Sequence, residues 1–252
     1  MNRPDPEDFT TDRYRLILEA ALAAGYRFIG FDAMAAARLS GDPVCALRHD
    51  CDNDPTAALR MAEIEAAMGV RSTYFLMLRS AMYNLMAKPH YDHARSILAL
   101  GHHLGFHFDY SCYGDIGPED IAARGEEESR MLERLLDRPV TAVSFHQPSA
   151  MVLDNHVKLS RINTYDPGDN LGFHYLSDSN MHWREGCPSA IFSDRRHPRL
   201  HLLVHPEWWT PEPMDVGRKW QAMFRNNFAA TQAVLLRTER SYGPRLHLEF
   251  QS

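Results

Sequence analysis

The stretch VCALRHDCDNDP, from Val44 to Pro55, joins a short apolar run directly to a cluster of charges. The apolar half favours a buried strand. Asp54 followed by Pro55 is typical of a helix N-cap and first helical residue, and we expect that helix to reach about Met68. Strand and helix therefore meet at a group of carboxylates. In parallel α/β folds, the carboxyl end of a strand is where functional groups gather.

The rest of the chain repeats this alternation. Helical spacing indicates helices, and β-branched or aromatic runs indicate strands. The expected helices are 11–24, 54–68, 93–100, 118–136 and 215–236, and the expected strands are 26–31, 44–48, 71–78, 103–107, 140–145, 162–164, 173–176, 190–192, 200–204 and 245–250. Since we find no repeat or linker, we predict one α/β domain over 1–252 with a parallel sheet, open or closed into a barrel.

Composition excludes several classes of function. The 27 basic and 33 acidic residues give a net charge of −6, so no basic field exists for nucleic acid or an anionic membrane. The polar N-terminus does not read as a signal peptide, and no run approaches the roughly 18 apolar residues of a membrane span. The four cysteines lack CxxC spacing and are expected to be free thiols, which favours the reducing cytoplasm. The oligomeric state cannot be read from the sequence.

The charged cluster after Val44 suggests metal and proton chemistry. Asp50, Asp52 and Asp54 repel one another unless a cation or hydrogen bonds offset their charge. Asp54 is explained as a helix cap. Asp50 and Asp52 point the same way if the strand continues, so one could bind a metal while the other accepts a proton.

A second cluster, GHHLGFHFD, spans residues 101–109. If 103–107 is a strand, His107 lies on one face and Asp109 continues that face. His102 lies roughly 16 Å from His107 in an extended chain, too far to share a metal. His107 is therefore the candidate ligand and Asp109 a possible second one, whereas His102 and His103 are expected to be structural.

Two more segments carry polar and aromatic groups. The strand 200–204 leads into His205, Trp208 and Trp209, and a histidine beside apolar groups or a carboxylate makes a workable general acid–base. The two tryptophans could belong to the core or face a sugar ring. A loop around Asp178 and Trp183 suits either a solvated turn or substrate binding.

In this order, these segments resemble the motifs of the polysaccharide deacetylase superfamily, also called the NodB-homology or carbohydrate esterase family four superfamily. The resemblance runs from about Val44 to Trp209. It implies a distorted (β/α)7 barrel with a bound divalent metal, for which zinc is the first candidate. It also implies Asp50 as catalytic base, Asp52 and His107 as metal ligands, and His205 as general acid.

The sequence departs from the family pattern at two positions. The second metal histidine of the family would fall at Ser111, and His146 stands where the family has an arginine that orients the base. A metal held by Asp52 and His107 alone would be weakly bound, so Asp109 or His146 is expected to supply the missing ligand.

The sequence therefore predicts a metal-dependent hydrolase that removes an acetyl or similar acyl group from a small sugar, a glycoconjugate or a related amide. The expected substrate-binding residues are His146, Arg48, Asp178, Trp183 and Trp208. One alternative is a carbohydrate-binding relative that has lost the metal site and catalysis. Another is a phosphoesterase, for which only Arg48 and Arg184 offer cations.

Overall fold

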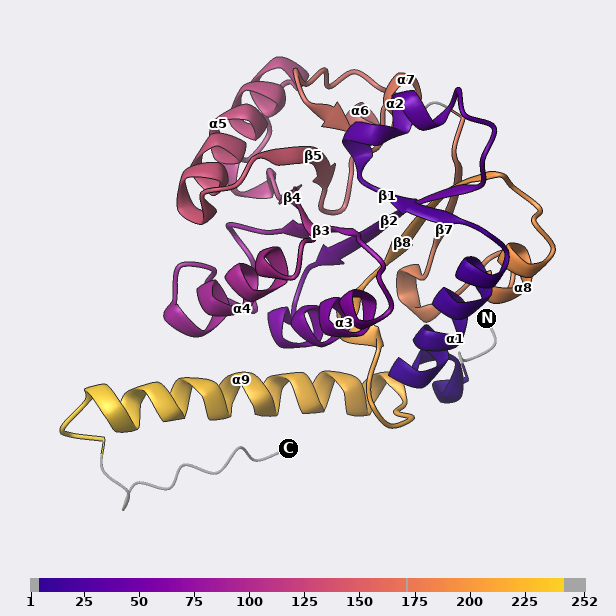
Figure 1. The fold of residues 1–252 in the computed structure, drawn as a ribbon. Helices are drawn as coiled ribbons and strands as arrows, with labels where there is room; N and C mark the ends of the chain where they lie inside the picture. Colours follow the sequence, from indigo (N-terminus) through magenta and orange to yellow (C-terminus); the bar gives the residue numbers. More distant parts are fainter. Residues whose placement is uncertain (1–4, 171, 243–252) are drawn as a thin grey trace.

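The computed structural model describes residues 5–170 and 172–242, which form an α/β fold around a single parallel sheet (Figure 1). The strands are β1 (Arg27–Ile29), β2 (Val44–Cys51), β3 (Thr73–Leu76), β4 (His103–Phe108), β5 (Val140–Phe145), β6 (Ile162–Asn163), β7 (His174–Ser177) and β8 (Arg199–Val204). The helices are α1 (Thr11–Ala23), α2 (Met34–Ala37), α3 (Pro55–Ala67), α4 (Lys88–Ala99), α5 (Pro118–Leu136), α6 (Ala150–Leu153), α7 (Pro167–Asn170), α8 (Pro188–Ser193) and α9 (Val216–Thr238). Five 3₁₀ turns, η1 (Pro6–Phe9), η2 (Phe31–Ala33), η3 (Ser111–Tyr113), η4 (Ser179–Met181) and η5 (Pro206–Trp208), complete the described part.

The sheet has the strand order β6-β5-β4-β3-β2-β8-β7, and every pairing in it is parallel. It curls into an incomplete barrel with helices on its outer side (Figure 1). The predicted α/β class, with a parallel sheet curled into an incomplete barrel, is thereby confirmed.

Strand β2 lies at the centre of this arrangement. Its amino half pairs with β1 and its carboxyl half with β3, while β8 runs along the other edge. All eight residues are buried, so β2 has no solvated face. Because side chains alternate along a strand, Cys45 and Leu47 pack outward in one apolar cluster, whereas Val44 and Ala46 pack in another with Phe31 and Phe75. Arg48 and Asp50 continue the second, inner face.

Several sequence predictions need correction. Residues 190–192 are helical and belong to α8, because Pro188 occupies its first turn and a three-residue apolar run does not distinguish strand from buried helix. Helix α4 begins at Lys88, five residues before the prediction, again with a proline in its first turn. The predicted strand 245–250 lies outside the described residues. In the described part of the chain, no helix is long and apolar enough to cross a membrane.

Candidate functional site

Six of the residues predicted from sequence line a pocket of about 420 Å³ at the carboxyl ends of β2, β4, β5 and β8. The sheet register explains the convergence. His49 pairs with Val204, so the next residues, Asp50 and His205, leave neighbouring strands side by side. The pocket is lined by Asp50, Asp52, Asn53, His107, Phe145, His146, Gln147, Pro148, Tyr165, Tyr175, Ser179, Asn180, Leu203, His205, Glu207, Trp208 and Trp220.

Asp52, His107 and His146 form a compact group of potential metal ligands. His107 Nε2 lies 2.9 Å from Asp52 Oδ1 and 3.3 Å from His146 Nδ1, and His146 Nδ1 lies 3.7 Å from Asp52 Oδ2. Tetrahedral coordination with zinc–ligand bonds of 2.0–2.2 Å separates ligand atoms by about 3.3–3.6 Å. The two histidine nitrogens and the Asp52 carboxylate oxygens therefore have nearly the spacing that one zinc ion needs.

The contacts of these ligands also fit a cation. Asp52 Oδ1 is buried, and although His107 lies close to it, the pair lacks hydrogen-bond geometry. The other ring nitrogen of His107, Nδ1, lies 2.6 Å from Ser144 Oγ. His107 on β4 and Ser144 on β5 are register partners in the sheet. Ser144 thereby fixes the ring and leaves Nε2 facing Asp52, as outer partners of metal-binding histidines do. His107 and His146 oppose burial and hold the pKa of the Asp52 carboxyl well below its usual range.

A second histidine–carboxylate group, His174, Glu185 and His197, differs in geometry. The two imidazole rings are stacked face to face, with centroids 3.6 Å apart and planes inclined by 7°. The nitrogen lone pairs of two parallel stacked rings lie in two separate planes. One ion therefore cannot lie in the plane of both rings. The group around Asp52 is therefore the better metal site.

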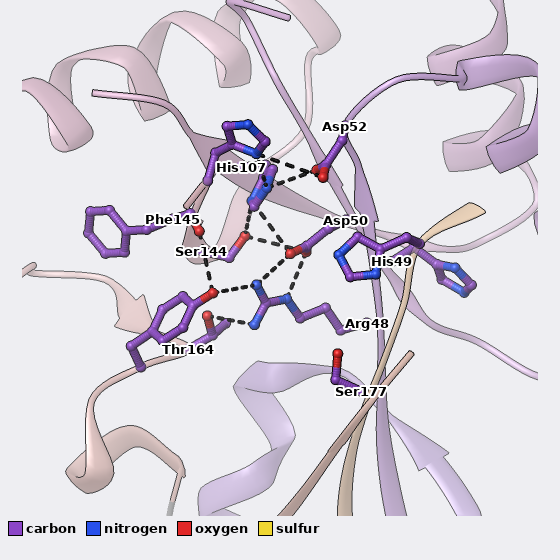
Figure 2. A network of polar contacts seen from close by, with 12 residues as sticks. Arg48, His49, Asp50, Asp52, His107, Ser144, Phe145, Thr164 and Ser177 are labelled. Atoms are coloured by element: carbon purple, nitrogen blue, oxygen red, sulfur yellow. Dashed lines mark hydrogen bonds and ion pairs between the residues drawn. The ribbon is translucent and has the colours of Figure 1, made fainter. Parts of the chain in front are cut away.

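Asp50 lies beneath the metal group in a fully buried ion pair (Figure 2). Arg48 Nε donates to Asp50 Oδ1 at 2.7 Å and Nη2 donates to Oδ2 at 2.6 Å. Arg48 Nη1 also donates to Thr164 Oγ1 at 3.0 Å, which anchors the guanidinium. Burial opposes ionisation of Asp50, but Arg48 and His107 outweigh it and lower the pKa of this carboxyl.

Directly after β8, His205 is held by Asp178. The buried Asp178 carboxylate lies 2.6 Å from His205 Nδ1 and accepts the backbone N–H of His205 at 3.0 Å. Trp209 Nε1 donates to the same carboxylate at 3.0 Å. Because a carboxylate only accepts, the proton of this pair resides on Nδ1 and Nε2 is left for the pocket. Burial lowers the pKa of His205, but Asp178 overrides it and raises that pKa to about 10.

Three predicted site residues lie elsewhere than expected. Arg48 has no exposed surface and does not line the pocket, so the predicted substrate contact is replaced by its pairing with Asp50. Asp178 is equally buried, and it contacts His205 instead of solvent. Trp183 stacks on Phe9 in a hydrophobic cluster and lines a separate pocket.

The remaining predictions can be placed as well. Trp208 and His146 line the pocket at the strand ends. Asp109 lies outside the metal group; its Oδ1 accepts the backbone N–H of Ser111 at 2.9 Å. His102, expected to be structural, is buried behind β3, where Nδ1 lies 3.5 Å from a Glu65 oxygen.

Tyr165, Tyr175, Glu207 and Trp220 are among the pocket residues to which sequence reasoning gave no role. Tyr165 follows β6 and Glu207 follows β8, so the rule that strand ends carry function could have found both. Burial raises the pKa of Glu207 to about 8, with the charge of nearby Asp52 adding to the shift. Tyr175 lies within β7, and Trp220 lies on α9, where no local pattern distinguishes a pocket residue from a core aromatic.

No protein-family model and no curated protein matches this sequence. Solved structures similar in fold include the chitin deacetylase from Colletotrichum lindemuthianum, with 16% identity over 75% of this chain and 84% of that one and a TM-score of 0.44. A family 4 acetyl xylan esterase from Clostridium thermocellum, in complex with a cobalt ion, shares 13% identity over 82% of this chain and 98% of that one, with a TM-score of 0.44.

A CE4-family pseudoenzyme from Bacillus anthracis shares 14% identity over 75% of this chain, with a TM-score of 0.41. The present chain spans 62% of the length of that protein. The pseudoenzyme and the acetyl xylan esterase are described as CE4-family and family 4 proteins, respectively.

Proposed function

We propose that this chain is a metal-dependent hydrolase that removes an acetyl or similar acyl group from a sugar or a related amide. The observation that carries the proposal is that three kinds of group line one pocket. They are the ligand group Asp52, His107 and His146, the Asp50 carboxylate, which Arg48 holds, and the His205 ring, which Asp178 holds. Acyl transfer to water needs an electrophile, a base and an acid. A metal on the ligand group would supply the electrophile, Asp50 the base and His205 the acid.

Asp52, His107 and His146 would hold a divalent ion, for which zinc is the first candidate. The ion would polarise an acyl carbonyl and lower the pKa of a water molecule. His146 thus takes the place of the ligand missing at Ser111, in preference to Asp109, which lies outside the group. Three protein ligands leave a coordination position open, as in catalytic sites.

The chain's own groups handle the protons. Asp50 is the base that accepts the proton of the attacking water, and Arg48 holds its carboxylate in place through two hydrogen bonds. His205 donates a proton to the leaving nitrogen or oxygen from Nε2. Asp178 keeps the ring oriented and charged at neutral pH, as the pKa of about 10 indicates.

The proposal is tested by loading the purified protein with zinc, cobalt or manganese and assaying acetate release from N- and O-acetylated sugars. We expect release that depends on the metal and is lost in Asp50→Asn. A protein that binds one metal ion and a sugar but releases no acetate would instead be a carbohydrate-binding relative.

The role of Asp178 gives a pH prediction. His205 must be protonated to act as an acid, so its raised pKa keeps activity through neutral pH and loses it as the pH rises towards 10. A cation on Asp52 would lower this pKa in wild type and variant alike. In Asp178→Asn the pKa of His205 should fall towards about 6.5, leaving roughly one molecule in thirty protonated at pH 8. As the pH rises, kcat/KM of the variant should therefore begin to fall at a lower pH than kcat/KM of the wild type. An unchanged pH profile would contradict the role given to Asp178.

A further inference from the structure

A smaller pocket lies beside the one at the strand ends. It has a volume of about 200 Å³, and Tyr175 and Ser179 line both pockets. Its other walls come from the end of β7 and from the loop 182–186, which follows η4. We call it the side pocket. Because the two pockets share lining residues, a molecule that reacts in the first has its nearest further binding space in the second.

The side pocket contains a positive charge without a partner. Arg184 lines it and is exposed, and in the described part of the chain its guanidinium forms no ion pair and no hydrogen bond. His182 is a second exposed lining residue, and its ring also has no hydrogen-bond partner among the described residues. A guanidinium that is not paired with a carboxylate keeps its planar set of N–H donors for an anion such as phosphate, which it can bind through two parallel hydrogen bonds.

Two serine hydroxyls add a further donor. Ser177 Oγ and Ser179 Oγ lie 2.6 Å apart, and Ser177 Oγ also accepts the backbone N–H of Ser179 at 3.0 Å. The contact between the two hydroxyls uses one of their two protons, so the other proton is left for a ligand. Asp178 stands between the two serines in the sequence and contacts His205. The serines therefore connect the side pocket with the residue that holds the proposed general acid.

Glu185 is the acidic residue that lines the side pocket, and its carboxylate already has a partner. Both of its oxygens lie 3.0 Å from His174 Nε2. Because a carboxylate only accepts, the proton of this contact resides on His174 Nε2. Glu185 thus pairs with His174 and leaves the neighbouring Arg184 unpaired. An anion in the side pocket would therefore meet a free cation and hydrogen-bond donors.

The proposed reaction determines which part of the substrate lies near the side pocket. Water adds to the acyl carbon and gives a proton to Asp50. The bond from that carbon to nitrogen or oxygen then breaks, the acyl group leaves as a carboxylic acid, and the leaving atom takes a proton from His205. The sugar that keeps this atom must lie beside His205, which Asp178 holds next to Ser177 and Ser179.

We propose, resting on the hydrolase function above, that the substrate is a sugar phosphate and that the side pocket binds its phosphate group, with Arg184 as the principal donor. A phosphate ester carries up to two negative charges and several acceptor oxygens, which match an unpaired guanidinium beside a donating hydroxyl. The proposal narrows the substrate class from a small sugar to a phosphorylated one. The acyl group then lies at the Asp52 group and the phosphate lies beyond Ser179.

Calorimetry with the full chain, stripped of metal by a chelator and dialysed, tests the proposal, because a bound metal would itself attract phosphate. The probes are N-acetylglucosamine, its 1-phosphate and its 6-phosphate. At least one phosphate ester should bind at least about ten-fold more tightly than the unphosphorylated sugar, and Arg184→Gln should remove most of this preference. Arg184→Lys keeps the charge and should retain part of it. The preference of the wild type should also shrink in about 0.5 M salt, which screens an exposed charge.

The matched control is Arg225→Gln, which removes the same charge from an exposed position of α9 outside both pockets and should keep the preference. Thermal melting checks that each variant is folded. Equal affinity for the three probes, binding of none of them, or a preference that survives Arg184→Gln would overturn the proposal. Failure of the hydrolase function looks different, because the phosphate preference would persist while the metal-loaded protein releases no acetate from any probe.

Discussion

Alanine at Asp52 or at His107 should abolish stoichiometric uptake of a divalent metal. Each side chain supplies one of three ligand atoms, and two remaining ligands in a pocket open to water hold zinc weakly. We expect about one metal ion per chain in the wild type and close to none in either variant, measured by elemental analysis after dialysis. Acetate release should fall with the metal.

The matched control for this experiment is Asp109→Ala. Asp109 is also an acidic residue at the end of β4, but its carboxylate accepts a backbone N–H and lies outside the ligand group. This variant should keep its metal, whereas His146→Ala should lose most of it. Full occupancy in Asp52→Ala and His107→Ala would remove the basis for metal-dependent catalysis.

Replacing Arg48 by methionine should destabilise the fold by about 3–5 kcal/mol, because a buried carboxylate would lose its ion-pair partner. Arg48 and Asp50 are both buried and joined by two hydrogen bonds. The free energy of unfolding is measured by urea titration at pH 7. The double variant Arg48→Met with Asp50→Asn should recover much of the loss, since no unpaired charge remains.

The pH dependence gives an independent check on this pair. The pKa of Asp50 is depressed in the folded protein, so the stabilisation is present above the unfolded value near 4 and is lost as the pH falls below it. In Arg48→Met this dependence should shrink or reverse, because burial alone raises the pKa of a carboxyl. Equal stability of Arg48→Met and wild type at pH 7 would contradict the role given to Arg48.

The fold was largely predictable because its strands carry clear local patterns. Val44–Arg48 is an apolar run, and the Asp54–Pro55 pair caps the next helix in the structure as the sequence predicts. The error at 190–192 has a physical cause. Ile191 and Phe192 are buried on one side of a short helix, and three apolar residues give no periodicity to separate helix from strand.

The convergence of the candidate residues on one pocket was predictable where they follow strand ends in the sequence, as Asp52, His107 and His205 do. A role was not predictable where it depends on pairing across the fold. Arg48 was expected to contact substrate, because the sequence does not reveal that Thr164, 116 residues away, anchors its guanidinium beside Asp50. Trp220 reaches the pocket only because α9 packs against η5, a tertiary contact with no local signal.

The most direct test of the central claim is anomalous diffraction from crystals grown with zinc. We predict a single strong peak within about 2.0–2.2 Å of an Asp52 carboxylate oxygen, His107 Nε2 and His146 Nδ1. A peak ligated by Asp109 in place of His146, a peak only at His174 and Glu185, or no peak in the pocket at all would contradict the account.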